Sequence, residues 1–413
     1  MPLFKPFKGI RAKSEFIKDF ATSPIEKLPK DELGKPAPEV SFLAMVKPLI
    51  SDKAEENVDR NLHKVRSNFE EMLRNKSLSQ DNSCIYLYSQ ILPDKSFFRG
   101  LLGLTSAEDF IKGKIKKHET TLAKRKENYA YYLDKVELQT EPVLLTYPAN
   151  SKLEVMMDYE EKSIPIINYT DKSGITHKVW KIDSRLTIKQ FKDVFEEIDA
   201  FYIADGHHRI GSIAINAKNR KSKDKNFIGT EPYNFVYSYV ISNNSIKIHD
   251  YNRVLKDLNG LTKKEFLKKL EDYFIIHEKG DIPYYPTQKH HIGMYIDKKF
   301  YSLHIKHELR SKEEGLKSLD HYFLDQNVFK NILNISNTKH TGKIGFVSGN
   351  STKEGLNKII DLVDSNQYEI GFIIYPISYT DLIQTSDLGQ KMPPKCTYIE
   401  PKLLTGLIMY DMK

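Results

Sequence analysis

The sequence has very little cysteine and no long apolar run, and both absences narrow what the protein can be. Cys84 and Cys396 are its only cysteines, so it offers neither a disulfide framework nor a cysteine metal site. No segment approaches the roughly 20 apolar residues that a membrane helix needs. Residues 1–11 also lack a secretory apolar region. We therefore expect a cytoplasmic protein with no membrane partner.

Two familiar enzyme motifs are missing as well. Segment 341–349 contains glycines and a lysine, but it lacks the spacing of the phosphate-binding loop of nucleoside triphosphatases. His118 and Glu119 are followed by Leu122 at the position where a zinc protease has its second histidine. The sequence thus excludes these two motifs as the source of its chemistry.

The charge balance is basic, with a formal net charge of +8 that suits an anionic partner such as a nucleotide, an anionic substrate or nucleic acid. The lysines, however, are scattered over many amphipathic segments, which is typical of a solvated surface. No helix-turn-helix with a basic recognition helix is recognisable, so nucleic acid is not favoured as a partner.

Residues 200–220 are the stretch around which the chemistry is organised. Residues 200–204 form a short apolar run typical of a buried strand, and apolar residues then recur at helical spacing to about residue 220. The turn between them reads Asp205-Gly206-His207-His208-Arg209. A glycine turn into a helix N-terminus makes a seat for phosphate, and the Arg209 fork can hold two phosphate oxygens. Asp205 would lie at the carboxyl end of the strand, where ligands bind in open α/β sheets.

A simpler interpretation is that Asp205 caps the helix and the histidines are surface residues. Asp is common at that position, so the cap explains Asp205 by itself. It does not explain His207, His208 and Arg209, because cations in the first turn of a helix oppose its dipole. A bound anion would remove that conflict, and we therefore favour an anion site.

Three other segments carry candidate ligand-binding residues. The pattern 105–108 predicts a capping box that opens a helix, and this helix would lead to His118, Glu119, Thr121, Lys124 and Arg125. A carboxylate among cations can serve an anionic ligand and its attacking group. Arg253 follows a predicted hairpin and either belongs to an ordinary turn or returns to the site. The loop 390–402 carries Lys391, Lys395 and Lys402, which can reach back into the same cleft.

The remaining pattern alternates helices and strands, and we place a domain boundary between residues 1–258 and 259–413. A polar stretch at 259–262 indicates a hinge before a new capping box. The expected strands and hairpins are 41–48, 84–90, 142–147, 169–182, 234–249, 291–305, 341–349, 368–376 and 403–409. The expected helices are 53–75, 187–198, 262–274, 322–333, 354–363 and 379–385.

These pieces, taken in order, resemble one known family over most of the chain. The matching residues are 41–43, the His118-Glu-x-Thr121 segment, residues 202–209, Asn252-Arg253 and residues 391–395. Together they are similar to the domain-of-unknown-function 1015 family of prokaryotic proteins. Its Asp-Gly-His-His-Arg turn resembles the ParB/sulfiredoxin-like fold, within which free-serine kinases carry a similar turn. The resemblance implies an α+β fold, with a ParB/sulfiredoxin-like mixed-sheet core in residues 1–258 and a C-terminal α/β portion in residues 259–413.

The resemblance also implies a reaction, namely transfer of a phosphoryl group from ATP or ADP to free L-serine with Mg²⁺. Asp205 would bind the metal or orient the substrate, Glu119 would be the base, and His207 would assist in catalysis. The residues implied in nucleotide or phosphate binding are Gly206, His208, Arg209, His118, Thr121, Arg253 and Lys395. The number of subunits stays open, a homodimer included.

Two other functions are compatible with the same resemblance. One is a ParB-like, nucleotide-dependent DNA-binding or regulatory protein without kinase activity, which salt-dependent DNA binding would support. The other is a sulfiredoxin-like thiol enzyme, which ranks last because neither cysteine lies in a recognisable basic motif.

Overall fold

The computed structural model describes residues 1–33, 35–50, 57–335, 342–349 and 352–413, which divide into two compact units. Unit 1 comprises residues 1–116, 121–246 and 401–413. Unit 2 comprises residues 117–120 and 247–400. The expected boundary at 258/259 differs from this division. Strand β13 (Tyr251–Leu255) joins the sheet of unit 2, whereas the last thirteen residues return to unit 1 through strand β20 (Tyr410–Asp411).

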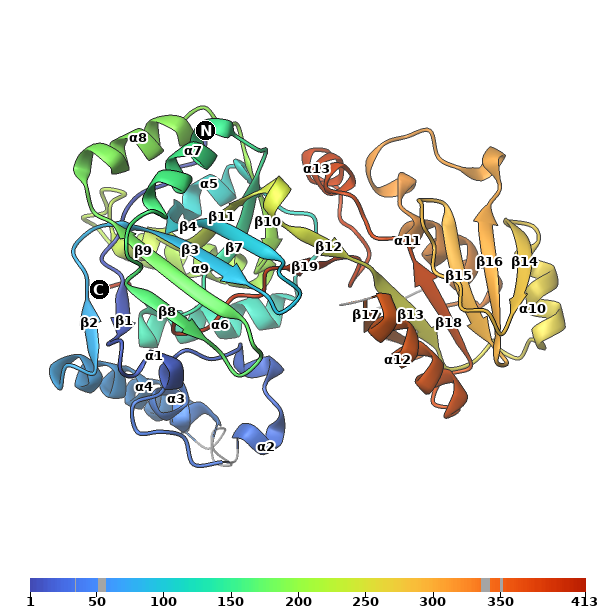
Figure 1. Cartoon of the computed structure of the whole chain (residues 1–413), viewed down its shortest axis with the longest axis horizontal. Coiled ribbons are helices and arrows are strands. Elements are labelled where there is room, and N and C mark those ends of the chain that lie inside the picture. Colours follow the sequence, from blue (N-terminus) through green and yellow to red (C-terminus); the bar gives the residue numbers. More distant parts are fainter. Residues whose placement is uncertain (34, 51–56, 336–341, 350–351) are drawn as a thin grey trace. The chain divides into compact units, whose positions relative to one another are not determined.

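Unit 1 is built on an eight-stranded mixed sheet (Figure 1). Its strands, in spatial order, are β5 (Ile115–Lys116), β10 (Phe201–Asp205), β7 (Val143–Tyr147), β11 (Phe235–Ser242), β4 (Phe97–Ser106), β3 (Ile85–Ile91), β9 (Thr176–Ile182) and β8 (Ile167–Thr170). The pairs β10–β5 and β11–β7 are parallel and the other pairs are antiparallel. Short pairs join β1 (Ile10–Ala12) to β2 (Leu78–Gln80) and β20 to β6 (Leu138–Gln139).

Helices of unit 1 pack on one another and on this sheet. Helix α9 (His207–Lys221) lies against α6 (Ala123–Val136), which contacts α4 (Val58–Arg74). The inward face of α9 carries Ile210, Ile213, Ala214 and Ala217, all buried at helical spacing as the sequence predicts. The other helices of this unit are α1 (Ile17–Phe20), α2 (Lys30–Leu33), α3 (Phe42–Ile50), α5 (Ala107–Ile111), α7 (Ser151–Glu160) and α8 (Arg185–Phe195).

Unit 2 contains a six-stranded antiparallel sheet with helices on both faces. Its spatial order is β14 (Phe274–Gly280), β16 (Lys299–Ile305), β15 (His291–Ile296), β18 (Ile370–Ile374), β13 and β17 (Ile344–Ser348). One face packs on α10 (Lys263–Leu270) and on α11 (Asp320–Phe323) with the π-helical turns Leu324–Ile332. The opposite face packs on α12 (Thr352–Asp364) through Ile359. Helix α13 (Tyr379–Asp387) and the pair of β12 (Lys247–His249) with β19 (Tyr398–Glu400) complete the unit.

The expected α+β class is confirmed, and so are the hairpins at 169–182 and 291–305 and the capping box at Thr262. The predicted helix at 53–75 is present as α4 from Val58, and residues 53–56 lie outside the described residues. No helix in the described parts of the chain has both the length and the apolar character needed to span a bilayer.

Four element predictions are wrong for identifiable reasons. Residues 42–50 form a helix rather than a strand, because the Ser41 hydroxyl accepts from the Ala44 amide as an N-cap. The cap predicted at 105–108 lies one residue later, at Ser106, which accepts from the Glu108 and Asp109 amides. The helix then ends at Ile111, because Gly113 takes a positive φ of 78° and closes the turn. Strand β12 pairs with β19 instead of folding back on β11. The final strand is Tyr410–Asp411 and not 403–409, where Thr405 and Met409 pair only in isolated bridges, with Thr22 and Ile10.

Candidate anion pocket in unit 1

The turn between β10 and α9 has the geometry that the sequence predicts. Gly206 adopts a φ of 97°, which glycine tolerates and other residues rarely do. Its amide donates to Asp205 Oδ1 at 2.8 Å, so the carboxylate is held against the turn. A Cβ on Gly206 would come within 3.0 Å of Arg209 Nε. The glycine therefore serves both the backbone conformation and the close approach of the Arg209 side chain.

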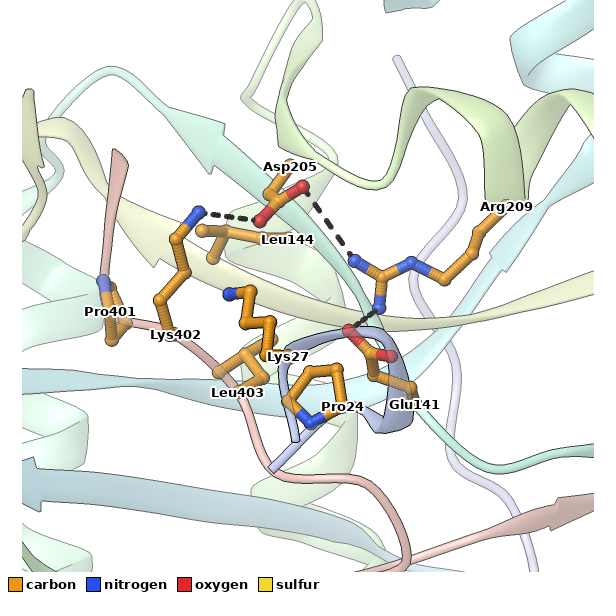
Figure 2. A pocket seen from close by; sticks show the side chains of 9 residues that line it. All are labelled: Pro24, Lys27, Glu141, Leu144, Asp205, Arg209, Pro401, Lys402 and Leu403. Atoms are coloured by element: carbon orange, nitrogen blue, oxygen red, sulfur yellow. Dashed lines mark hydrogen bonds and ion pairs between the residues drawn. The ribbon is translucent and has the colours of Figure 1, made fainter. Parts of the chain in front are cut away.

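A small pocket opens beside this turn (Figure 2). Its cavity volume is only about 10 Å³. A cavity needs roughly 10–15 Å³ to hold one water molecule, so with these side-chain positions the pocket admits a single polar atom of a ligand and not a whole nucleotide. Its lining residues, all from unit 1, are Pro24, Lys27, Glu141, Leu144, Asp205, Arg209, Pro401, Lys402 and Leu403.

Charges of both signs face this pocket. Lys402 Nζ donates to Asp205 Oδ2 at 2.8 Å, and the Arg209 guanidinium lies 3.8 Å from Asp205 Oδ1. Burial opposes ionisation of Asp205, but Lys402, Arg209 and Lys27 outweigh it and hold the carboxyl pKa well below its usual range. Asp205 is therefore an anion at neutral pH, and it cannot be a general acid there.

Arg209 is held in place by two further contacts at the start of β7. Its Nη1 donates to the Pro142 carbonyl oxygen at 2.8 Å and forms an ion pair with Glu141. Burial raises the pKa of Glu141 despite the neighbouring Arg209. Burial, reinforced by Lys402, lowers the pKa of Lys27. The pocket thus combines three basic side chains with two carboxylates.

The two histidines of the turn lie in the first turn of α9, as predicted. The His207 side chain is buried and His208 is half-buried. Thr121 belongs to unit 1 and is half-buried just before α6. These placements bring His207, His208 and Arg209 onto the same helix N-terminus, whereas a role for any of them in binding a ligand stays a prediction.

His118 and Glu119 lie in the short segment of unit 2 formed by residues 117–120. The structure does not place them on a helix, since α6 begins only at Ala123. Instead the segment runs beside the loop near residue 391, where the Met392 amide donates to the His118 carbonyl at 2.8 Å and Lys391 Nζ donates to the Lys117 carbonyl at 3.1 Å. Their catalytic roles stay predictions.

Arg253 and Lys395 come together in unit 2. Arg253 is 2% exposed, and it donates to the carbonyls of Tyr251, Pro394 and Lys395 at 2.9–3.0 Å. It therefore clamps the proline-fixed loop through the loop backbone, and its predicted phosphate contact is untested. Cys396, beside it, is buried. Burial raises the pKa of the Cys396 thiol above its usual range, which disfavours the reactive thiolate that a redox enzyme would need.

Sequence reasoning missed two of the charged pocket residues. Glu141 stands immediately before the predicted strand at 142–147, where an acidic residue is an ordinary strand boundary. Lys27 lies in an aperiodic arm, and no local pattern distinguishes it from other lysines. Lys402 was expected to reach a cleft, and its contact with Asp205 gives it a defined partner.

The pocket does not fit a magnesium ion held by Asp205. Mg²⁺ needs carboxylate, phosphate or water oxygens around it. Here Asp205 is paired with Lys402, and Glu141 is paired with Arg209. A cation added to these carboxylates would meet three basic side chains. The expected metal role of Asp205 therefore has no support in the geometry of this pocket.

Three comparisons with known proteins bear on these observations. The family described as "Protein of unknown function (DUF1015)" matches residues 4–322. A search of curated proteins found no match.

The solved structures with similar chains include a free serine kinase mutant with AMP, at 12% identity and a TM-score of 0.38, covering 74% of this chain and 91% of that one. The same kinase without that mutation, also with AMP, matches at 14% identity and a TM-score of 0.35, covering 74% and 91%. SbnI from Staphylococcus aureus, truncated at its C-terminus, matches at 12% identity and a TM-score of 0.36, covering 72% and 82%. At these TM-scores the matches carry no argument about function.

Proposed function

The chain belongs to the DUF1015 family, and we propose that it is a small-molecule kinase that transfers a phosphoryl group from ATP or ADP to the hydroxyl of free L-serine. The product would be O-phosphoserine. The proposal rests on the chemistry of the unit 1 pocket and on the resemblance of its Asp-Gly-His-His-Arg turn to that of free-serine kinases.

The observation that carries the proposal is the set of charges around this turn. Arg209 and Lys402 approach a carboxylate at a glycine turn that opens a 15-residue helix. Phosphoryl transfer depends mainly on positioning and on neutralising charge on the phosphoryl oxygens, with little covalent help from the protein. The helix N-terminus and the basic side chains supply such neutralisation without having to reorganise during the reaction.

The roles of individual residues follow from their states. Arg209, fixed by Glu141 and Pro142, presents its remaining guanidinium edge to a ligand oxygen. Asp205 is ionised and can orient a substrate hydroxyl or ammonium group. Glu119 as the base is proposed on the resemblance alone. The resemblance is also the only support for ligand contacts by His118, Thr121, His207, His208, Arg253 and Lys395.

A screen for the acceptor tests the proposal. Purified protein would be incubated with magnesium, ATP or ADP, and an equimolar pool of free hydroxy amino acids, and phosphorylated products would be identified by mass spectrometry. We expect O-phosphoserine in excess over phosphothreonine and phosphotyrosine, and none with Arg209→Ala.

The control Arg185→Ala changes an exposed arginine at the start of α8 and is expected to retain activity. Nucleotide binding without any phosphorylated amino acid would contradict the kinase proposal. That result would favour the nucleotide-dependent DNA-binding or regulatory alternative.

A further inference from the structure

Lys402 enters the pocket from a segment far from the glycine turn in sequence. Its Nζ lies 2.8 Å from Asp205 Oδ2, and its side chain is 27% exposed. Pro401 and Leu403, on either side of it, line the same pocket. The C-terminal segment therefore delivers one charged side chain to the β10–α9 turn, as Figure 2 shows.

The backbone of Lys402 is fixed by a buried chain of hydrogen bonds. Gln90 Nε2 donates to the Lys402 carbonyl at 3.0 Å and to the Tyr88 hydroxyl at 2.7 Å. That hydroxyl lies 2.8 Å from His177 Nδ1, and His177 Nε2 lies 3.1 Å from Asp171 Oδ2. Since Gln90 donates to the Tyr88 oxygen, the Tyr88 proton is directed to Nδ1 and the Nε2 proton to Asp171.

Burial lowers the pKa of His177, so the imidazole in this series of hydrogen bonds is neutral at physiological pH. Tyr88, Gln90 and His177 are all buried. A buried and satisfied polar network is rigid because each member fixes the next. The start of the Lys402 side chain is therefore fixed, while its ammonium end lies at the small pocket on a side chain that is 27% exposed.

The charges in the pocket do not cancel. Among the lining residues, Lys27, Arg209 and Lys402 are cations and Asp205 and Glu141 are carboxylates, so one positive charge is left over. The charge of Glu26 also acts on Arg209, but Glu26 is paired with Arg125 outside the lining, and this pair adds no net charge. The charge of Lys27 interacts with those of Asp205, Glu141, Arg209 and Lys402, so each carboxylate lies near more than one cation. An oxyanion with a single charge would complete this balance.

We propose that Lys402, and not a metal ion, is the charge partner of Asp205, and that Lys402 and Lys27 bind an oxyanion group of the ligand in this pocket. The oxyanion is either a nucleotide phosphate or the carboxylate of a free amino acid. A lysine has three donors on its ammonium group, so Lys402 can keep Asp205 and still donate to a ligand oxygen. The inference deepens the proposed function at the same pocket, but its test is binding rather than phosphoryl transfer, and the two can fail separately.

Binding without metal is the test. ADP, inorganic pyrophosphate and L-serine would each be titrated into the full chain by calorimetry in the presence of EDTA. We expect at least one of them to bind. A response to ADP and pyrophosphate identifies the oxyanion as phosphate, whereas a response to L-serine alone identifies it as carboxylate.

Variants separate charge from structure. Lys402→Met is expected to weaken binding of that probe by about tenfold or more, because a charged hydrogen bond is lost. Lys402→Arg, which keeps the charge, should bind within a few-fold of the wild type. Lys27→Met, in a short turn on the surface, should also weaken binding and supplies a second test if Lys402→Met does not fold. Lys413→Met, in the same C-terminal segment but paired with Glu70, is the matched control and should change nothing.

A manganese titration followed by electron paramagnetic resonance tests the metal half of the proposal. Without ligand, the wild type and Asp205→Asn should bind Mn²⁺ alike, so that no stoichiometric site is lost in the variant. Such a site would overturn the proposal. Failure of all three probes to bind in EDTA, or unchanged binding by both Lys402→Met and Lys27→Met, would overturn it as well.

Discussion

Asp325, in the π-helical turns of unit 2, should make the stability of that unit depend on pH in an unusual direction. Burial raises the pKa of its carboxyl to about 6, and the charge of Arg253 offsets only part of the rise. Its Oδ1 is buried and accepts no hydrogen bond from any residue in the described ranges. An unpartnered carboxylate is costly to bury, so the folded unit prefers the protonated form.

The sign and the size follow from this preference. Between the ordinary carboxyl pKa near 4 and the folded value, the folded state binds more protons than the unfolded state, so stability falls as pH rises. A shift of about two pKa units corresponds to about 3 kcal/mol once the folded carboxyl is fully ionised. Between pH 4.5 and 7.5 the loss is about 2 kcal/mol. Asp325→Asn removes the titrating group and should therefore remove this loss.

Hydrogen exchange measures the effect in unit 2 alone. Protection of amides in β13 and β18, normalised to intrinsic exchange rates, would be compared between the variant and the wild type at both pH values. The protection factor of Asp325→Asn divided by that of the wild type should rise by about 30-fold between pH 4.5 and pH 7.5. Asp272→Asn, an exposed position after α10, should leave the ratio constant. A ratio that is also constant for Asp325→Asn would refute the reasoning.

Two further predictions concern the proposed reaction. Gly206→Ala places a side chain at positive φ and against Arg209, so it should lower the stability of unit 1 by about 1–2 kcal/mol and also abolish phosphoryl transfer. Gly229→Ala is the control, because Gly229 has a similar φ but open space around it. Urea unfolding followed by Trp180 fluorescence should show a similar loss of stability in this variant, while its activity is kept. Equal activity in the two variants would contradict the role of the turn. Glu119→Gln should bind ADP normally but form no phosphoserine, and near-normal turnover in a folded variant would exclude it as the base.

The parts of the fold that were predicted correctly are those with a local cause. The β10–α9 turn follows from an apolar run, a glycine and a helical repeat, and the hairpin at 169–182 follows from alternation around a polar turn. Residues 42–50 are apolar enough for either a strand or a helix, and the Ser41 cap decides for the helix. The partner of β12 is β19, about 150 residues later, and no local pattern encodes a pairing at that distance.

In the candidate pocket, too, the residues that were predicted are those with a local sequence signal. Asp205, Gly206 and Arg209 are neighbours in sequence, so one motif predicts all three. Lys27 and Glu141 are brought to them only by tertiary packing, and a lone lysine in an arm or a lone glutamate before a strand carries no signal. Lys402 is an intermediate case: the prolines and lysines of its loop marked it as a candidate, but the sequence did not show that it would pair with Asp205.

A phosphorus NMR time course tests most directly the proposed phosphoryl transfer to a free amino acid. Protein, magnesium, ATP and L-serine would be followed in one sample, with ADP in place of ATP in a second and Arg209→Ala in a third. We expect a new phosphomonoester resonance that grows as the terminal phosphate of the nucleotide declines, depends on L-serine, and is absent with Arg209→Ala. Release of inorganic phosphate alone, or an unchanged spectrum with both nucleotides, would contradict it.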